Sequence, residues 1–159
     1  GITWTEQNSG LAESVQNSLR GITYGNNLFI ATGGDGLVLT STDGEQWSER
    51  NSNTTTPLYN VVYGTNIFII SGSSGKIFKS SDGASWTSID IPSNNVFEGL
   101  TYSKSLFVSV GNEGKILSSD DGFSWSSRLS DTSNSLKAIT VGSISSKNFN
   151  SNNSSLKLK

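Results

Sequence analysis

The chain has 159 residues, of which 33% are apolar, and it carries a net charge of −2 with no cysteine, histidine or methionine. That length suffices for one domain with a buried core, and the many glycine and small polar residues suit short strands joined by turns better than long helices. Without Cys or His we expect no disulfide, no metal site or cofactor of the usual kinds, and no histidine general base. The charge argues against a nucleic-acid partner, and no run approaches the ~18 apolar residues of a membrane span.

Residues 1–18 contain one predicted strand, which includes Trp4, and a linker. From Leu19 onward the chain repeats with a period of 39 residues, so that residues 19–57, 58–96 and 97–135 align without a gap. Aromatic residues and glycines recur at the same place in each repeat, such as Tyr24, Tyr63 and Tyr102, or Trp47, Trp86 and Trp125.

The first repeat predicts four strands: Leu19–Tyr24, Leu28–Thr32, Leu37–Ser41 and a fourth that starts at Trp47. The first strand alternates apolar and polar residues, whereas the second is a nearly continuous apolar run typical of a buried strand. Gly, Asn and Asp fill the connections, and Gly33–Gly36 predicts at least two residues with positive φ. Four short strands per repeat with recurring glycines and aromatics predict an all-β fold of β-propeller blades.

Three segments share the pattern Ser-x-Asp-Gly-x-x-Trp: Ser41–Trp47, Ser80–Trp86 and Ser119–Trp125. This pattern resembles the Asp-box, or BNR repeat, of sialidases, other glycosidases and many binding propellers, although it has one residue fewer between Asp and Trp. The wider tract, over about residues 1–142, is similar to repeats of bacterial secreted or surface propellers. The resemblance implies a propeller fold and an extracellular or cell-surface location.

The recurring aspartate and tryptophan of this pattern have a structural interpretation. The carboxylate is expected to accept backbone N–H bonds inside its turn, and the indole to fill space between adjacent blades. One carboxylate per turn is a poor cage for a hard cation, so we expect no metal there. These residues are Asp43, Trp47, Asp82, Trp86, Asp121 and Trp125.

The two ends of the chain bear on ring closure. The chain opens with a predicted fourth strand, whereas residues 136–142 repeat the first strand and residues 143–159 lose the pattern, so 136–159 is a degenerate last repeat. Three complete blades and one blade shared between the termini would make a four-bladed ring. Alternatively, the chain forms an arc that a second copy or another segment completes, and we favour the arc. Because the chain lacks methionine, we expect it to be either processed or a segment of a longer protein.

The candidate ligand-binding residues are those that vary while the repeat around them stays constant. One position on the first strand, which lines the central channel of a propeller, changes from repeat to repeat: it holds Arg20, Tyr59, Glu98 and Lys137. Two turns that face one mouth of the propeller carry Asp35 and Glu113, and an exposed turn carries Phe123.

From these residues we predict a non-catalytic module, and not an enzyme, that presents a binding surface to a protein or a glycan. An incomplete sialidase-like glycosidase is one alternative, but it needs a cluster of arginines, and the chain has only Arg20, Arg50 and Arg128. The last two are predicted on the outermost strand of a blade. A structural module of a larger assembly, including a homo-oligomer, is the other alternative.

Overall fold

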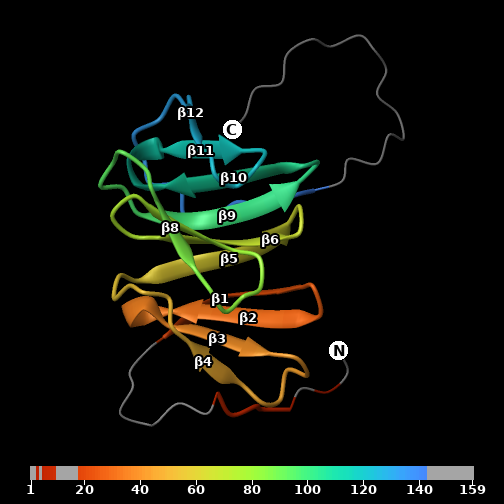
Figure 1. Cartoon of the computed structure of the whole chain (residues 1–159). Helices are drawn as coiled ribbons and strands as arrows, with labels where there is room; N and C mark the ends of the chain where they lie inside the picture. Colours follow the sequence, from red (N-terminus) through yellow and green to blue (C-terminus); the bar gives the residue numbers. More distant parts are fainter. Residues whose placement is uncertain (1–2, 4, 10–17, 143–159) are drawn as a thin grey trace.

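The computed structural model describes residues 3, 5–9 and 18–142. Within them the chain folds into three four-stranded antiparallel sheets, one per repeat, stacked face to face from the first sheet at the bottom of Figure 1 to the third at the top. This confirms the all-β propeller prediction and its three complete blades. No described helix is long and apolar enough to be a candidate membrane span.

Each sheet follows the order of its strands in the chain. The first sheet contains β1 (Leu19–Gly25), β2 (Leu28–Gly33), β3 (Val38–Ser41) and β4 (Ser48–Arg50). The second contains β5 (Leu58–Gly64), β6 (Ile67–Gly72), β7 (Lys76–Ser80) and β8 (Thr87–Asp90). The third contains β9 (Phe97–Ser103), β10 (Leu106–Gly111), β11 (Ile116–Ser119) and β12 (Ser126–Arg128). Short 3₁₀ turns η1 (Gly34–Gly36) and η2 (Asn112–Gly114) connect β2 to β3 and β10 to β11.

The third and fourth strands begin one residue later than predicted. Leu37 still belongs to the turn, because its N–H donates to the Gly34 carbonyl oxygen at 2.9 Å. The predicted positive φ angles are confirmed, since Asp35 has φ 50° and Gly36 has φ 75°. A side chain at Gly36 would also collide with the Thr54 carbonyl, which lies over the turn.

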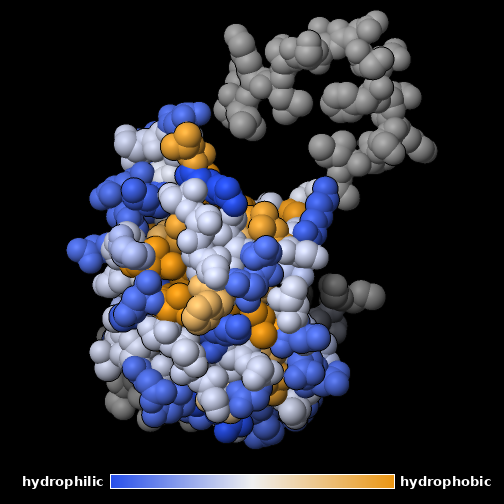
Figure 2. Space-filling view, turned by 45° about the horizontal axis from the view of Figure 1, so that its top comes forward, coloured by the Kyte–Doolittle hydropathy of each residue, from blue (hydrophilic) through white to orange (hydrophobic). Residues whose placement is uncertain are grey.

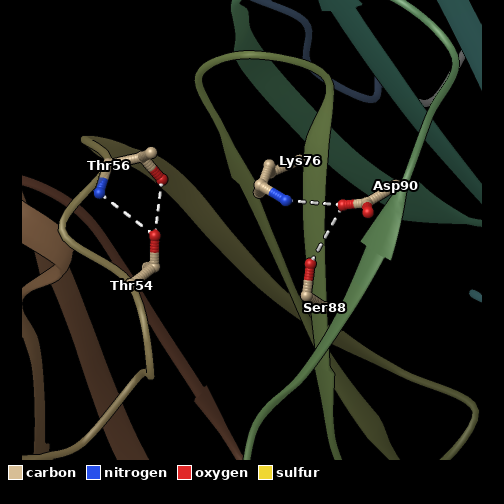
Figure 3. Close-up of polar contacts among 5 residues, drawn as sticks. All are labelled: Thr54, Thr56, Lys76, Ser88 and Asp90. Carbon is tan, nitrogen blue, oxygen red and sulfur yellow. Dashed lines mark hydrogen bonds and ion pairs between the residues drawn. The ribbon is translucent and has the colours of Figure 1, made fainter.

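The linkers between sheets are held to these turns. Ser52 is buried and its hydroxyl donates to the Gly36 carbonyl oxygen at 2.6 Å. In the same linker, the hydroxyls of Thr54 and Thr56 lie 2.9 Å apart (Figure 3). The linker therefore folds back over η1 before it enters β5.

Outer strands are joined by exposed polar contacts. Lys76 on β7 lies 2.7 Å from an Asp90 carboxylate oxygen on β8, and the Ser88 hydroxyl donates to the same oxygen at 3.3 Å (Figure 3). The Lys76 ammonium lowers the pKa of Asp90. Such exposed pairs contribute little to folding stability, so the stability of the chain depends mainly on its buried side chains.

The core lies between successive sheets. In the first interface, Ile30 and Val38 pack against side chains of the second sheet, and in the second interface Ile69 and Ile77 pack against the third. Their partners are aliphatic or aromatic and fully or nearly fully buried: Leu58, Val61, Phe68, Ile70, Phe78, Trp86, Phe97, Leu100, Phe107 and Leu117. Each buried aliphatic or Phe side chain stabilises the stack by about 1.5–3 kcal/mol. On the face shown in Figure 2, hydrophobic residues form separate patches among hydrophilic ones.

The predicted start of a fourth repeat lies against the third sheet. Residues 136–142 form no paired strand, but Ala138 packs over Gly99 as Asn60 packs over Gly21, 39 residues apart in both cases. The Leu136 N–H also donates to the Gly111 carbonyl oxygen at 2.9 Å. Residues 143–159 and Trp4 itself lie outside the described residues, and the described residues 3 and 5–9 around Trp4 are not in a strand. The division of these two segments into repeats stays a prediction.

Candidate functional site

The antiparallel order gives every sheet two distinct ends. One end, here called the linker end, carries the turn between the second and third strands and the linker that leads to the next sheet. The other end, here called the Asp-turn end, carries the first hairpin turn and the Ser-x-Asp-Gly turn. The first strands lie closest together, because β1 packs on β5 and β5 packs on β9, so they form the inner edge of the arc (Figure 1).

Four predicted contact residues form a row along this inner edge, at the linker end. We call Arg20, Tyr59, Glu98 and Lys137 the inner row. The Arg20 guanidinium carbon lies 4.8 Å from the centroid of the Tyr59 ring, within cation–π distance. The Lys137 ammonium lies 3.4 and 3.5 Å from the two Glu98 carboxylate oxygens. The fold thus couples the row into two neighbouring pairs.

Partial burial fixes one member of each pair. Tyr59 is half-buried and accepts a hydrogen bond from the Ser73 hydroxyl at 3.4 Å. The Glu98 side chain is 28% exposed and that of Lys137 is 72% exposed, so the carboxylate is anchored and the ammonium faces solvent. The row therefore offers an aromatic ring, a carboxylate and two cations at the surface.

Asp35 and Glu113 also lie at the linker end, on the η1 and η2 turns. Both are exposed and have φ near 50°, at 50° and 54°. Glu113 accepts a hydrogen bond from the Asn95 side-chain amide at 3.3 Å. Among the described residues no three acidic side chains come close enough to hold a metal ion. The fold gathers six of the seven candidate binding residues at one end.

Phe123 lies at the opposite, Asp-turn end. Its ring is 61% exposed, with the Lys79 ammonium 5.8 Å from the centroid. A groove of ≈350 Å³ lies beside this ring, and the hydroxyl-bearing residues Ser81, Ser85 and Thr87 of the second repeat line it. Phe123 is therefore a separate site from the inner row.

In the three Asp turns (Ser41–Trp47, Ser80–Trp86 and Ser119–Trp125) the aspartate accepts the same set of hydrogen bonds. In the second, Asp82 Oδ1 accepts the N–H groups of Ala84 and Ser85, each at 2.8 Å, and the Ser80 hydroxyl at 2.9 Å. The Ser85 and Ala84 backbone donors, then Ser80, lower the pKa of Asp82 from 3.8 to about 2.

The equivalent bonds in the other two turns have the same effect. Backbone donors, the Gln46 N–H first and the Glu45 N–H next, lower the pKa of Asp43. The Ser124 and Phe123 N–H groups, in that order, lower the pKa of Asp121. These carboxylates are occupied in holding their turns, which fits the structural interpretation.

The tryptophans of the Asp turns are not equivalent. Trp86 is 6% exposed and packs in the interface between the first two sheets, and Trp125 packs in the next interface. Trp47 instead packs against Ala31, Leu37 and Leu39 of its own repeat, and it lines a pocket together with Gln7 and Ser9. It therefore differs from the prediction that each indole fills a gap between blades, because no described sheet precedes the first.

Sequence reasoning missed two features near the inner row. A pocket of ≈290 Å³ lies beside Arg20 and is lined by Leu19, Ile22 and Ala31. Asn60 bridges β5 to β9, since its side-chain amide donates to the Leu100 carbonyl oxygen at 3.4 Å. The available signal for Asn60 was its identity: the same position holds glycine in the first and third repeats.

Stacked four-stranded antiparallel sheets, each in chain order with its first strand at the inner edge, define the chain as a β-propeller protein. More particularly, it belongs to the DUF6242 β-propeller domain family, whose model matches residues 1–136. No curated protein matches the chain.

Solved propeller structures share the fold at low sequence identity. YCF48 bound to D1 peptide superposes with a TM-score of 0.66 at 19% identity, over 88% of this chain and 48% of that one. YCF48 from Cyanidioschyzon merolae gives 0.62 at 22% identity, over 76% and 40%. The computationally designed Ika4 protein gives 0.63 at 16% identity, over 87% and 89%. The chain thus spans less than half the length of either YCF48 chain.

Proposed function

We propose that this chain is a non-catalytic propeller module that binds an extended segment of a protein partner along the inner row. The observation that carries the proposal is the coupling of Arg20 to Tyr59 and of Glu98 to Lys137 within a row that lies on equivalent strands of successive repeats. A row of this kind offers hydrogen bonds, charge and an aromatic face to one passing segment, and such mixed anchors are the usual energetic centre of protein interfaces.

Two further observations support a binding role over a catalytic one. The arginines a sialidase-like site would need are apart, because Arg50 and Arg128 lie on the outer strands β4 and β12. Each is tied to the neighbouring strand, with Arg50 Nε donating to the Thr40 hydroxyl at 2.9 Å and Arg128 Nε to the Ser118 hydroxyl at 2.7 Å. In addition, one similar propeller structure is that of YCF48 bound to D1 peptide, which supports a peptide as the kind of partner.

A glycan is the second candidate ligand, at the groove beside Phe123. An exposed aromatic ring facing hydroxyl groups suits a sugar ring, which has apolar C–H faces and polar edges. The resemblance of the Asp turns to the Asp-box of glycosidases and binding propellers also supports a glycan ligand. An extracellular or cell-surface location of the chain stays a prediction.

The test is selection of peptides from a random-sequence display library on the full chain. We expect enriched peptides to bind Arg20→Ala and Tyr59→Ala variants at least tenfold more weakly, and to bind the matched outer-strand variant Arg128→Ala as tightly as the parent. Enriched peptides that bind all variants equally would refute the inner row as the site. A glycan array run in parallel would favour the second candidate if binding were lost in Phe123→Ala.

A further inference from the structure

The first sheet has an apolar face whose counterparts in the other two sheets are buried. Leu19 is 49% exposed and Ile22 is 62% exposed. The residues 39 positions later, Leu58 and Val61, are 0% and 1% exposed because the first sheet covers them. Pockets of ≈290 and ≈200 Å³ open on this face, and Gln7 and Ser9 of the same chain help to line the smaller one. We call the exposed part of this surface, formed by Leu19, Ile22 and Tyr24 beside Trp47, the open face; Ala31 and Leu39 behind it are buried, at 4% and 1% exposure.

The two sheet-to-sheet interfaces inside the chain show which residues pack together when such a face is covered. In each, the tyrosine of one sheet lies directly over the glycine that ends the first strand of the preceding sheet. Tyr63 lies over Gly25, and Tyr102 lies over Gly64, so closely that a Cβ at either glycine would overlap the ring. Tyr24 is the third tyrosine of this series, and its ring is 55% exposed.

The glycine that would complete the series lies at the other end of the stack. Gly142 occupies the position of Gly25 and Gly64 in the fourth repeat, and no described atom lies within 4 Å of a Cβ built there. The third repeat breaks the series in a compensated way: Ser103 replaces the glycine, and the smaller Val141 replaces the tyrosine that would lie over it. Residues 136–142 therefore pack against the third sheet in the place where the first strand of a next repeat would lie, and Gly142 is exposed at their end.

The Asp turns repeat this asymmetry. A Cβ at Gly83 would meet Leu28 and Ile30 of the preceding sheet at 2.6 and 2.9 Å, whereas a Cβ at Gly44 would meet only Phe29 of its own sheet, at 3.8 Å. At the Asp-turn end, too, the first sheet thus lacks the neighbour that the second sheet has.

We propose that the open face is the docking surface for a second copy of this chain, seated through the C-terminal end of its stack so that Tyr24 of one copy lies over Gly142 of the other. The same contact made twice about a two-fold axis closes a ring, which is the commonest symmetry of homo-oligomers. The arc has the span for this, since it superposes on 48% of one larger propeller chain and 42% of the designed Ika8 chain. The docking interface continues the two interfaces already present within the chain.

The first test is the mass of the full chain in solution, by light scattering. We expect two chains per particle, and one chain per particle for Ile22→Asp, which places a charge on the open face without touching a buried site. Leu129→Asp is the matched control: Leu129 is 93% exposed, and its counterparts Asn51 and Asp90 are exposed too, so its position takes no part in stacking. One chain per particle for the parent, or two for Ile22→Asp, would overturn the proposal.

Cysteine pairing gives a second and independent test, because the chain has no cysteine of its own. A mixture of Tyr24→Cys and Gly142→Cys chains is expected to form a covalent dimer under oxidising conditions, in higher yield than either variant alone. If a chain carrying both substitutions forms the disulfide only within one chain, the ring has four blades and the proposal is wrong. Absence of any crosslink would also overturn it. Neither test depends on the inner row, so failure here leaves the proposed peptide binding intact.

Discussion

Tyr63 lies directly over Gly25, and there is no room between the ring and the glycine for even one additional carbon. The contact joins the second sheet to the last residue of β1. Gly25→Ala is therefore expected to push the two sheets apart and to lower the free energy of unfolding by about 1–3 kcal/mol. Urea denaturation measures this directly. Ser103→Ala is the matched control, because that position already carries a Cβ, and its change should stay within about 0.5 kcal/mol.

Burial predicts unequal roles for the tryptophans. Trp86→Ala should cost about 3–5 kcal/mol of unfolding free energy, since the indole is nearly fully buried between two sheets. Trp47→Ala should cost less than half as much in a single chain, because Trp47 packs on only one sheet. The comparison is made by urea denaturation at a protein concentration low enough to keep chains separate. Equal losses would contradict the inequivalence of the two sites.

Two buried hydroxyls in the described core have no hydrogen-bond partner: those of Thr32 and Ser71. The third repeat places Val110 at the same position, where it is 4% exposed. Thr32→Val removes the unpaired polar group with little change of shape, so we expect it to raise the free energy of unfolding by about 1 kcal/mol. Its thermal midpoint should rise accordingly.

Ser109 provides the contrast for that substitution. Its hydroxyl is equally buried but donates to the Gly99 carbonyl oxygen at 3.0 Å. Ser109→Ala leaves the carbonyl without its donor and should lower the free energy of unfolding by about 1–2 kcal/mol. If both substitutions changed stability in the same direction, hydrogen bonding would not be the cause.

The Asp turns predict how stability depends on acid. The pKa of Asp82 is about 2 in the folded chain and close to its ordinary 3.8 when unfolded. The unfolded chain thus binds a proton more readily, so the contribution of this turn is complete above about pH 4 and is lost as the pH falls towards 2. Urea denaturation between pH 6 and 2 measures the slope. Asp82→Asn should make it shallower, and an unchanged slope would contradict the assignment.

Much of the fold is readable in the sequence because strands and tight turns are specified by short-range sterics. The 39-residue period predicted the three four-stranded sheets, and the glycine-rich run at Gly33–Gly36 predicted positive φ angles that the structure has. The predicted boundaries at Leu37 and Trp47 were wrong by one residue, because the backbone bonds that close a turn depend on geometry rather than residue type.

The candidate site was only partly readable. Repeat alignment identified Arg20, Tyr59, Glu98 and Lys137 as equivalent, yet gave no reason to expect two coupled pairs with different chemistry. Phe123 was grouped with them, whereas strand direction places it at the opposite end.

The amino-acid sequence alone determined the blade, since each 39-residue repeat holds four short apolar runs joined by turn residues that favour consecutive antiparallel hairpins. The tertiary structure decided which copies of that blade are covered. Leu19 and Leu58 are the same residue in the same pattern, but only Leu58 has a sheet against it. Burial is a property of neighbours in space, so two equivalent repeats acquire different exposed surfaces when one stands inside the stack and the other at its end.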